Sequence, residues 1–313
     1  MYRIKNHPNL SFKLINNISG WLVFGIAAVT YLLTIEPTAS LWDCGEFIAT
    51  SVGLQVGHPP GAPLFMIISR LFAMLTSDPA KHGIMINAMS ALASAFTILF
   101  LFWTISHMAR KLIIGNAEEG SLGDTIAIIG ASTVGALAYT FSDTFWFSAV
   151  EAEVYALSSL FTALVFWAIL KWENIADQPH SNRWLVLIAY LMGLSIGVHL
   201  LNLLAIPAIV FIYYFKKYTP TLKGIVKTAL LSVFILGFVN FFMIPYFIKR
   251  GGWFELLFVN GLGFHFNTGV IIYVFLLITG LAWGISYTFK KNKAVLNTVL
   301  TCVVMILIGY SSY

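Results

Sequence analysis

Long apolar runs separated by short polar segments dominate the pattern of the chain from about residue 18 onward. A helix needs about 20 apolar residues to cross the hydrocarbon core of a bilayer. The runs predict about nine transmembrane helices, at 18–35, 84–109, 125–142, 154–172, 184–200, 201–215, 228–246, 269–289 and 295–313. The stretch 64–76 has about 13 residues and contains Arg70, so it predicts a helix lying in the membrane interface within the first outer loop. We therefore predict an all-α polytopic transmembrane bundle that forms a single domain over 1–313.

Composition excludes a water-soluble protein, because 59% of the residues are hydrophobic and 10% are charged, against about 25% charged in soluble domains. The formal charge of +5 is spread along the chain beside the apolar runs, which indicates membrane lipids as surroundings and no nucleic-acid partner. Cys44 and Cys302 are too far apart in sequence to suggest a disulfide framework or a metal cluster. The polar segment 1–17 and the absence of a cleavage site after the first apolar run indicate a retained first span.

The distribution of Lys and Arg predicts the orientation. With the N-terminus in the cytoplasm, four of the 18 basic residues fall outside, namely Arg70, Lys81, Lys249 and Arg250, and the other fourteen, from Arg3 to Lys293, fall inside. Eight acids fall outside: Glu36, Asp43, Glu46, Asp78, Asp143, Glu151, Glu153 and Glu255. Because acids contribute little to topology, their concentration in short outer loops indicates an active or binding site on the extracytoplasmic face.

The first outer loop, 36–63, contains the most informative residues. Asp43 and Glu46 are three apart, so on a helical turn they share a face. A partly desolvated carboxylate at a membrane interface is suited to act as a general base. An alternative is that the pair caps a helix start, with Asp43 as the cap and Glu46 at the box position. His58 precedes Pro-Pro-Gly, a rigid turn that fixes its place near the acids, although an isolated loop histidine is often incidental.

Two further groups of polar residues lie near predicted outer helix ends. Glu151 and Tyr155 are four apart and share a helix face, with Glu153 pointing away. Acids at a helix start within a membrane are usually functional, but they also complement the helix dipole. His199 and Asn202, three apart, share a face near the end of the span 184–200. Substrate contact and a packing or hydrogen-bonding role both fit these two residues.

Small and basic residues complete the candidates. Gly193 and Gly197 form a small-xxx-small face for close helix packing. Lys249 and Arg250 adjoin a Gly-Gly pair in a predicted outer loop and are suited to bind a lipid phosphate. The alternative for the two cations is contact with solvent or lipid headgroups. The sequence contains no recognised metal-ligand set, so we predict neither an obligatory metal nor a cofactor.

The first outer loop carries a family resemblance. An acidic motif after span one, then His-Pro-Pro, an interfacial helix and a second span (82–111) resemble the start of the GT-C glycosyltransferases. The similarity is greatest to the protein O-mannosyltransferases, whose first loop has an adjacent Asp-Glu pair and His-Pro-Pro-Leu. Here the acids are separated, in Asp43-Cys-Gly-Glu46, and His58-Pro-Pro-Gly follows. The segments WDCGEF and VGHPPGAPLF resemble more specifically the Bacteroidetes-type multispan proteins related to the animal O-mannosyltransferase of plexin-type receptor domains. This resemblance extends over essentially the whole chain.

The resemblance implies an inverting enzyme of the bacterial inner membrane. It would transfer a sugar, with mannose expected, from a polyprenyl-phosphate donor to Ser or Thr hydroxyls of exported acceptor proteins. Asp43 is the first candidate for the base and Glu46 the second. Glu151, Glu153 and Tyr155 would line the sugar or acceptor pocket. The resemblance also implies a longer protein, and the apolar end at Tyr313 agrees with that expectation.

Two other functions use the same features. A transporter or flippase for a lipid or small solute would use the outer acids to bind its substrate, although transporters usually bind at the bilayer midplane. A non-catalytic membrane subunit would be insensitive to replacement of Asp43.

Overall fold

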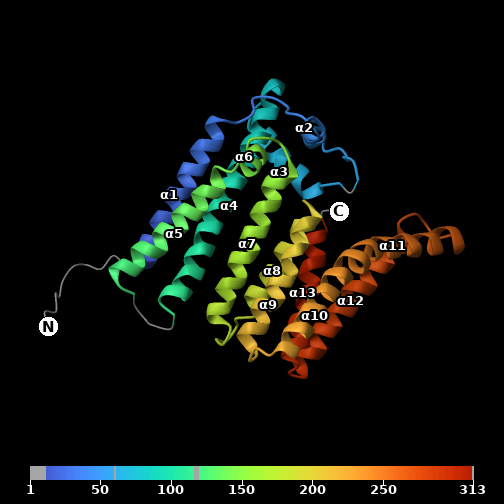
Figure 1. The fold of residues 1–313 in the computed structure, drawn as a ribbon. Coiled ribbons are helices and arrows are strands. Elements are labelled where there is room, and N and C mark those ends of the chain that lie inside the picture. Colours follow the sequence, from blue (N-terminus) through green and yellow to red (C-terminus); the bar gives the residue numbers. More distant parts are fainter. Residues whose placement is uncertain (1–11, 60, 116–119, 312–313) are drawn as a thin grey trace. The chain divides into compact units, whose positions relative to one another are not determined.

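The computed structural model describes residues 12–59, 61–115 and 120–311. Within these ranges every regular element is helical, which confirms the all-α prediction (Figure 1). Arg3 and Lys5, which are among the fourteen basic residues predicted to lie inside, are outside the described residues.

The helices follow one another through short connections. In chain order they are α1 (Phe12–Leu33), α2 (Cys44–Gly53), α3 (Pro63–Ala73), η1 (Pro79–Lys81), α4 (His82–Ile113), α5 (Leu122–Thr140), α6 (Asp143–Ala149), α7 (Val154–Ile175), α8 (Arg183–Ile196), η2 (Leu200–Leu204), α9 (Ala205–Lys217), α10 (Leu222–Gly237), η3 (Phe238–Met243), α11 (Ile244–Glu255), η4 (Leu256–Gly261), α12 (Thr268–Lys290) and α13 (Ala294–Tyr310). Elements η1 and η2 are 3₁₀-helical, and η3 and η4 are π-helical.

Seven helical segments of the described chain are long and apolar enough to cross a membrane. They are Phe12–Leu33, Pro79–Ile113, Leu122–Thr140, Val154–Ile175, Leu200–Lys217, Leu222–Gly261 and Thr268–Lys290. The spans expected at 184–200 and 295–313 correspond to α8 and α13, which are apolar but have 14 and 17 residues. The chain is thus a polytopic membrane protein, with seven clear candidate spans where the sequence predicted about nine.

The chain divides into two compact units. The first runs to Leu170 and also includes Gly197–His199. In it α1, α4 and α5 lie side by side (Figure 1) around a core that contains Val23, Ile98 and Phe102. The hydroxyl of Tyr31 donates a 3.0 Å hydrogen bond to the carbonyl of Thr140, which joins α1 to the end of α5.

Polar contacts fix the chain between α1 and α3 on this unit. The side-chain amide of Asn87, on α4, donates to the carbonyls of Glu36 (2.7 Å) and Thr38 (2.9 Å). Arg70 on α3 donates to the carbonyl of Val52 at 2.7 Å, which ties α3 to α2. Helix α3 has only 11 residues, so it is too short to span, as its sequence predicts.

The second unit comprises Lys171–Ile196 and the described chain from Leu200 onward. Helices α8 and α13 pack closely in this unit, because a Cβ atom at Gly193 would overlap the backbone of Ile306. The small-residue prediction is thus correct for Gly193. Gly197 does not belong to this face, because α8 ends at Ile196.

A charge cluster joins the loop after α7 to the end of α9 in the second unit. Asp177 accepts from Lys216 at 2.8 Å and from Lys217 at 2.9 Å, and these two contacts lower the pKa of its carboxyl to about 2. These two ion pairs therefore place the loop after α7 beside the end of α9.

Candidate functional site

Asp43 precedes the first turn of α2 with its carboxylate free of the helix. Trp42 before it has a φ of 63°, in the left-handed region, so the chain turns sharply into the helix. Asp43 occupies the cap position but makes no side-chain capping hydrogen bond. Its side chain is 55% exposed. The capping-box alternative is therefore wrong, and the carboxylate of Asp43 is open to another partner.

Glu46, one turn along α2, holds His58 in place. The carboxylate of Glu46 accepts a 2.7 Å hydrogen bond from the backbone N–H of His58 and lies 3.1 Å from its Nδ1. These contacts, the backbone bond first, lower the pKa of the Glu46 carboxyl. His58 in turn places Nε2 3.9 Å from Oδ2 of Asp43. The two acids and the histidine therefore converge, as the shared helix face and the rigid turn predict.

Glu151 and Glu153 are buried next to the start of α2. They are 4% and 6% exposed. The hydroxyl of Ser40 donates a 2.5 Å hydrogen bond to Glu151, and the thiol of Cys44 lies 3.7 Å from Glu153. The prediction that Glu151 and Tyr155 share a helix face is wrong, because α7 begins at Val154 and both acids precede it.

Burial raises the pKa of two groups beside Glu151, the Glu153 carboxyl and the Cys44 thiol. Desolvation raises the pKa of the Glu153 carboxyl, and the nearby charges of Glu151 and Asp43 add to the effect. Burial likewise raises the pKa of the Cys44 thiol to about 12. Cys44 is fully buried, so it is an inert packing and hydrogen-bonding residue at the start of α2.

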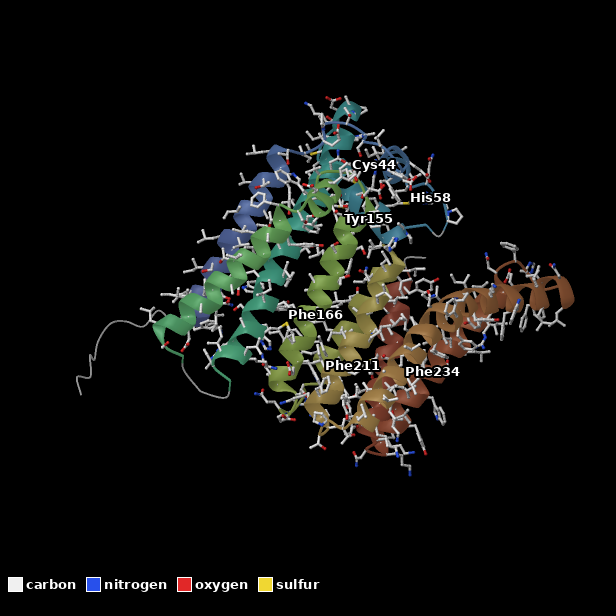
Figure 2. The ribbon with its side chains drawn as sticks, viewed as in Figure 1. Cys44, His58, Tyr155, Phe166, Phe211 and Phe234 are labelled. Atoms are coloured by element: carbon white, nitrogen blue, oxygen red, sulfur yellow. The ribbon has the colours of Figure 1, made fainter. Side chains whose placement is uncertain are left out.

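Tyr155 and His199 form an aromatic pair next to these elements. Their rings are 5.5 Å apart, and the backbone carbonyl of Gly197 accepts a 2.8 Å hydrogen bond from Leu64 at the start of α3. Figure 2 shows Cys44, His58 and Tyr155 at the same end of the first unit. His199 follows the end of α8, whereas Asn202 is buried in η2 of the second unit. The predicted common helix face of these two residues is therefore wrong.

Lys249 and Arg250 lie on α11 in the second unit. Each rests over an aromatic ring of its own helical segment, Lys249 over Tyr246 at 5.8 Å and Arg250 over Phe242 at 5.5 Å. The second unit also contains an apolar cavity of about 490 Å³ between α8, α9, α10 and α13. Its lining includes Tyr213 and Cys302 but no charged side chain.

Sequence reasoning missed the residues that support the acids. Ser40 contacts both Cys44 and Glu151, and Asn87 holds the loop carbonyls. Asn87 is fully buried within an apolar span. A buried amide in a membrane needs hydrogen-bond partners, so an asparagine in an apolar run could have been recognised from the sequence. Nothing in the sequence distinguishes Ser40. Together the residues of the site present the carboxylate of Asp43 beside the Glu46–His58 pair, an arrangement suited to removing a proton from a weakly acidic hydroxyl.

Comparisons with known proteins find relatives that match the part of the chain containing this site. The family model described as "Protein O-mannosyl-transferase TMEM260 N-terminal domain" matches residues 43–222, starting at Asp43. The chain is 25% identical over 187 residues to "Protein O-mannosyl-transferase tmem260" of Dictyostelium discoideum, covering 58% of this chain and 21% of that protein. It is 26% identical over 238 residues to "Protein O-mannosyl-transferase TMEM260" of Mus musculus, covering 74% of this chain and 31% of that protein. The chain thus spans less than a third of the length of these relatives. No solved structure is significantly similar to the chain.

Proposed function

The chain belongs to the family of the protein O-mannosyl-transferase TMEM260 N-terminal domain, and from this premise we propose that it is a membrane glycosyltransferase. It transfers a sugar, with mannose expected, from a polyprenyl-phosphate donor to Ser or Thr hydroxyls of exported proteins. The reaction takes place on the extracytoplasmic face of the bacterial inner membrane. A donor with a lipid tail stays in the bilayer, so its reactive end is reached at the membrane surface.

The observation that carries the proposal is the open carboxylate of Asp43 at the start of the family-matched segment. Glu46 is committed to His58 by two contacts, and a lowered pKa makes a carboxylate a weaker base. Asp43 is therefore the base, and Glu46 holds the loop. The contacts support the order that the resemblance implies, in which Asp43 is the first candidate and Glu46 the second.

The chemical step is a direct displacement. Asp43 accepts the proton of the acceptor hydroxyl, and the hydroxyl oxygen forms a bond to the anomeric carbon. The bond between that carbon and the phosphate oxygen breaks, and its electron pair leaves with the polyprenyl phosphate. Attack opposite the leaving group inverts the anomeric carbon. A positioned base contributes typically 10²–10⁴-fold to such a rate.

The remaining candidates take supporting roles. Ser40 contacts Glu151, and Cys44 contacts Glu153. The two buried acids therefore position the start of α2. Tyr155 is 47% exposed beside His199, and an exposed aromatic ring is suited to pack against a sugar.

The test is sugar transfer from polyprenyl-phosphate mannose to an acceptor peptide by the purified full-length protein. Asp43→Asn keeps the shape but removes basicity, and we expect a fall of about 10²–10⁴-fold in turnover. Glu46→Gln should have a milder effect. Asp143→Asn, which removes an exposed acid at the start of α6, is the matched control. Near-normal turnover in Asp43→Asn, Glu46→Gln and the double variant would refute the general-base assignment.

A further inference from the structure

The outer end of the first unit carries an excess of negative charge. Segments 34–82 and 141–153 hold seven acids, Glu36, Asp43, Glu46, Asp78, Asp143, Glu151 and Glu153, against two basic residues, Arg70 and Lys81, a formal charge of −5 with histidines neutral. Arg70 is bound to the carbonyl of Val52, and Lys81 pairs with Asp78 at 3.6 Å. A phosphate that approached Asp43 would therefore meet carboxylates whose charge the basic residues of these segments do not balance.

Three of these side chains form a ligand set for a cation. Asp43, Glu46 and His58 each offer one ligand atom, and these atoms all lie within 4.8 Å of one another. The oxygen of Glu46 and Nδ1 of His58 are already 3.1 Å apart. Ligands of an octahedral ion with bonds of about 2.1 Å are about 3 Å apart. The two contacts use different ring nitrogens of His58, Nδ1 toward Glu46 and Nε2 toward Asp43, and one ion binds only one of them. The three ligand atoms, which lie within 4.8 Å of one another, therefore need to close by up to about 2 Å around the ion, which exposed side chains do by rotation.

We propose that Asp43, Glu46 and His58 bind a divalent cation that receives the phosphate of the lipid-linked donor. The inference rests on the proposed function for the identity of the phosphate, but not for the ion itself. Two carboxylates and one imidazole suit Mn²⁺ or a similar first-row ion. Three protein ligands leave coordination positions open, as in catalytic metal sites. The sequence, in which the three residues are not spaced as a known metal motif, predicts no such site.

The ion offsets the repulsion between the carboxylates of the site and the phosphate of the donor. It binds one oxygen of Asp43, and the second oxygen stays available for the acceptor hydroxyl. A phosphate oxygen of the donor takes an open position, so the negative charge that develops on the leaving polyprenyl phosphate forms beside a cation instead of beside carboxylates. The same ion places the leaving group and the base near each other.

The direct test measures metal binding without sugar transfer. Purified full-length protein in detergent, treated with chelator and desalted, is titrated with Mn²⁺, and the loss of the free-ion signal is followed by electron paramagnetic resonance. We expect saturable binding of one ion. Asp43→Asn, Glu46→Gln and His58→Gln should each weaken it at least about tenfold, because each removes a ligand. Asp143→Asn removes the same charge outside the set and should bind as the unaltered protein does. Unaltered thermal unfolding of each variant shows that the fold is kept.

A second titration, with polyprenyl phosphate present, tests the phosphate. Linkage requires that a phosphate bound to the ion raise the affinity for Mn²⁺, so we expect tighter Mn²⁺ binding both in the unaltered protein and in Asp143→Asn. Absence of saturable binding, equal binding in all variants, or no response to the phosphate would overturn the proposal. Transfer that persists in chelator would overturn the metal site and leave the glycosyltransferase standing. Bound Mn²⁺ without transfer to any acceptor would support the metal site and count against the glycosyltransferase.

Discussion

Replacing Gly193 with alanine measures how tightly α8 packs against α13. The added Cβ would overlap the backbone of Ile306, and backbone cannot rotate away as a flexible side chain does. The two helices must separate, and such overpacking costs typically about 1–3 kcal/mol. Alanine also raises helix propensity by about 1 kcal/mol relative to glycine. The net loss of stability is therefore smaller than the clash itself.

Gly280→Ala isolates the clash. Gly280 lies in α12 of the same unit, and a Cβ atom there meets nothing within 4 Å. Because the propensity term is common to both substitutions, the difference between the two variants is the packing cost alone, about 1–3 kcal/mol. The free energy of unfolding is measured by titration of the micelle-bound protein with a denaturing detergent. Equal stability of Gly193→Ala and Gly280→Ala would refute the close approach of α8 and α13.

Three further predictions concern chemistry and orientation. The Cys44 thiol, with its pKa raised to about 12 and no exposed surface, should resist alkylation at pH 8 in the folded protein and react fully after unfolding, as mass spectrometry would report. Desolvation raises the pKa of Glu153 above its ordinary value of 4.5, so its carboxyl destabilises the fold increasingly as pH rises above that value. Glu153→Gln should remove this part of the pH dependence of unfolding, and an unchanged profile would contradict the assignment. A reporter fused after Lys217 should be cytoplasmic and one near Gly61 external, and a cytoplasmic Gly61 fusion would exclude an extracytoplasmic site.

The sequence was sufficient wherever local spacing decides the outcome. Apolar runs identified the candidate spans, and the interval between Asp43 and Glu46 placed both acids on one side of α2. The expectation that His58 lies near the acids is confirmed. Gly193 was also identified correctly, because small residues let the backbones of two apolar helices approach closely.

Prediction failed where contacts distant in sequence determine a helix end. Helix α7 begins at Val154, because the preceding turn is held by Ser40, 111 residues away from Glu151. The region after Ile196 leaves the helix, and its Gly197 carbonyl bonds to Leu64 of α3. Periodicity extends a helix through such positions, since nothing local opposes it. The acids therefore were found, but their burial and partners were not.

The helical run from Leu222 to Gly261 has a length that limits how it can lie in a bilayer. Its 40 residues, at 1.5 Å each, follow a path of about 60 Å, twice the roughly 30 Å of hydrocarbon. Only about half of the run fits across the hydrocarbon once, so the remainder is at or beyond the headgroup layer. Pro245, which cannot donate to the preceding turn, divides the two halves, and Lys249, Arg250 and Trp253 follow it. Residues of these kinds favour the headgroup layer, so they are suited to fix the depth of α10 in the membrane.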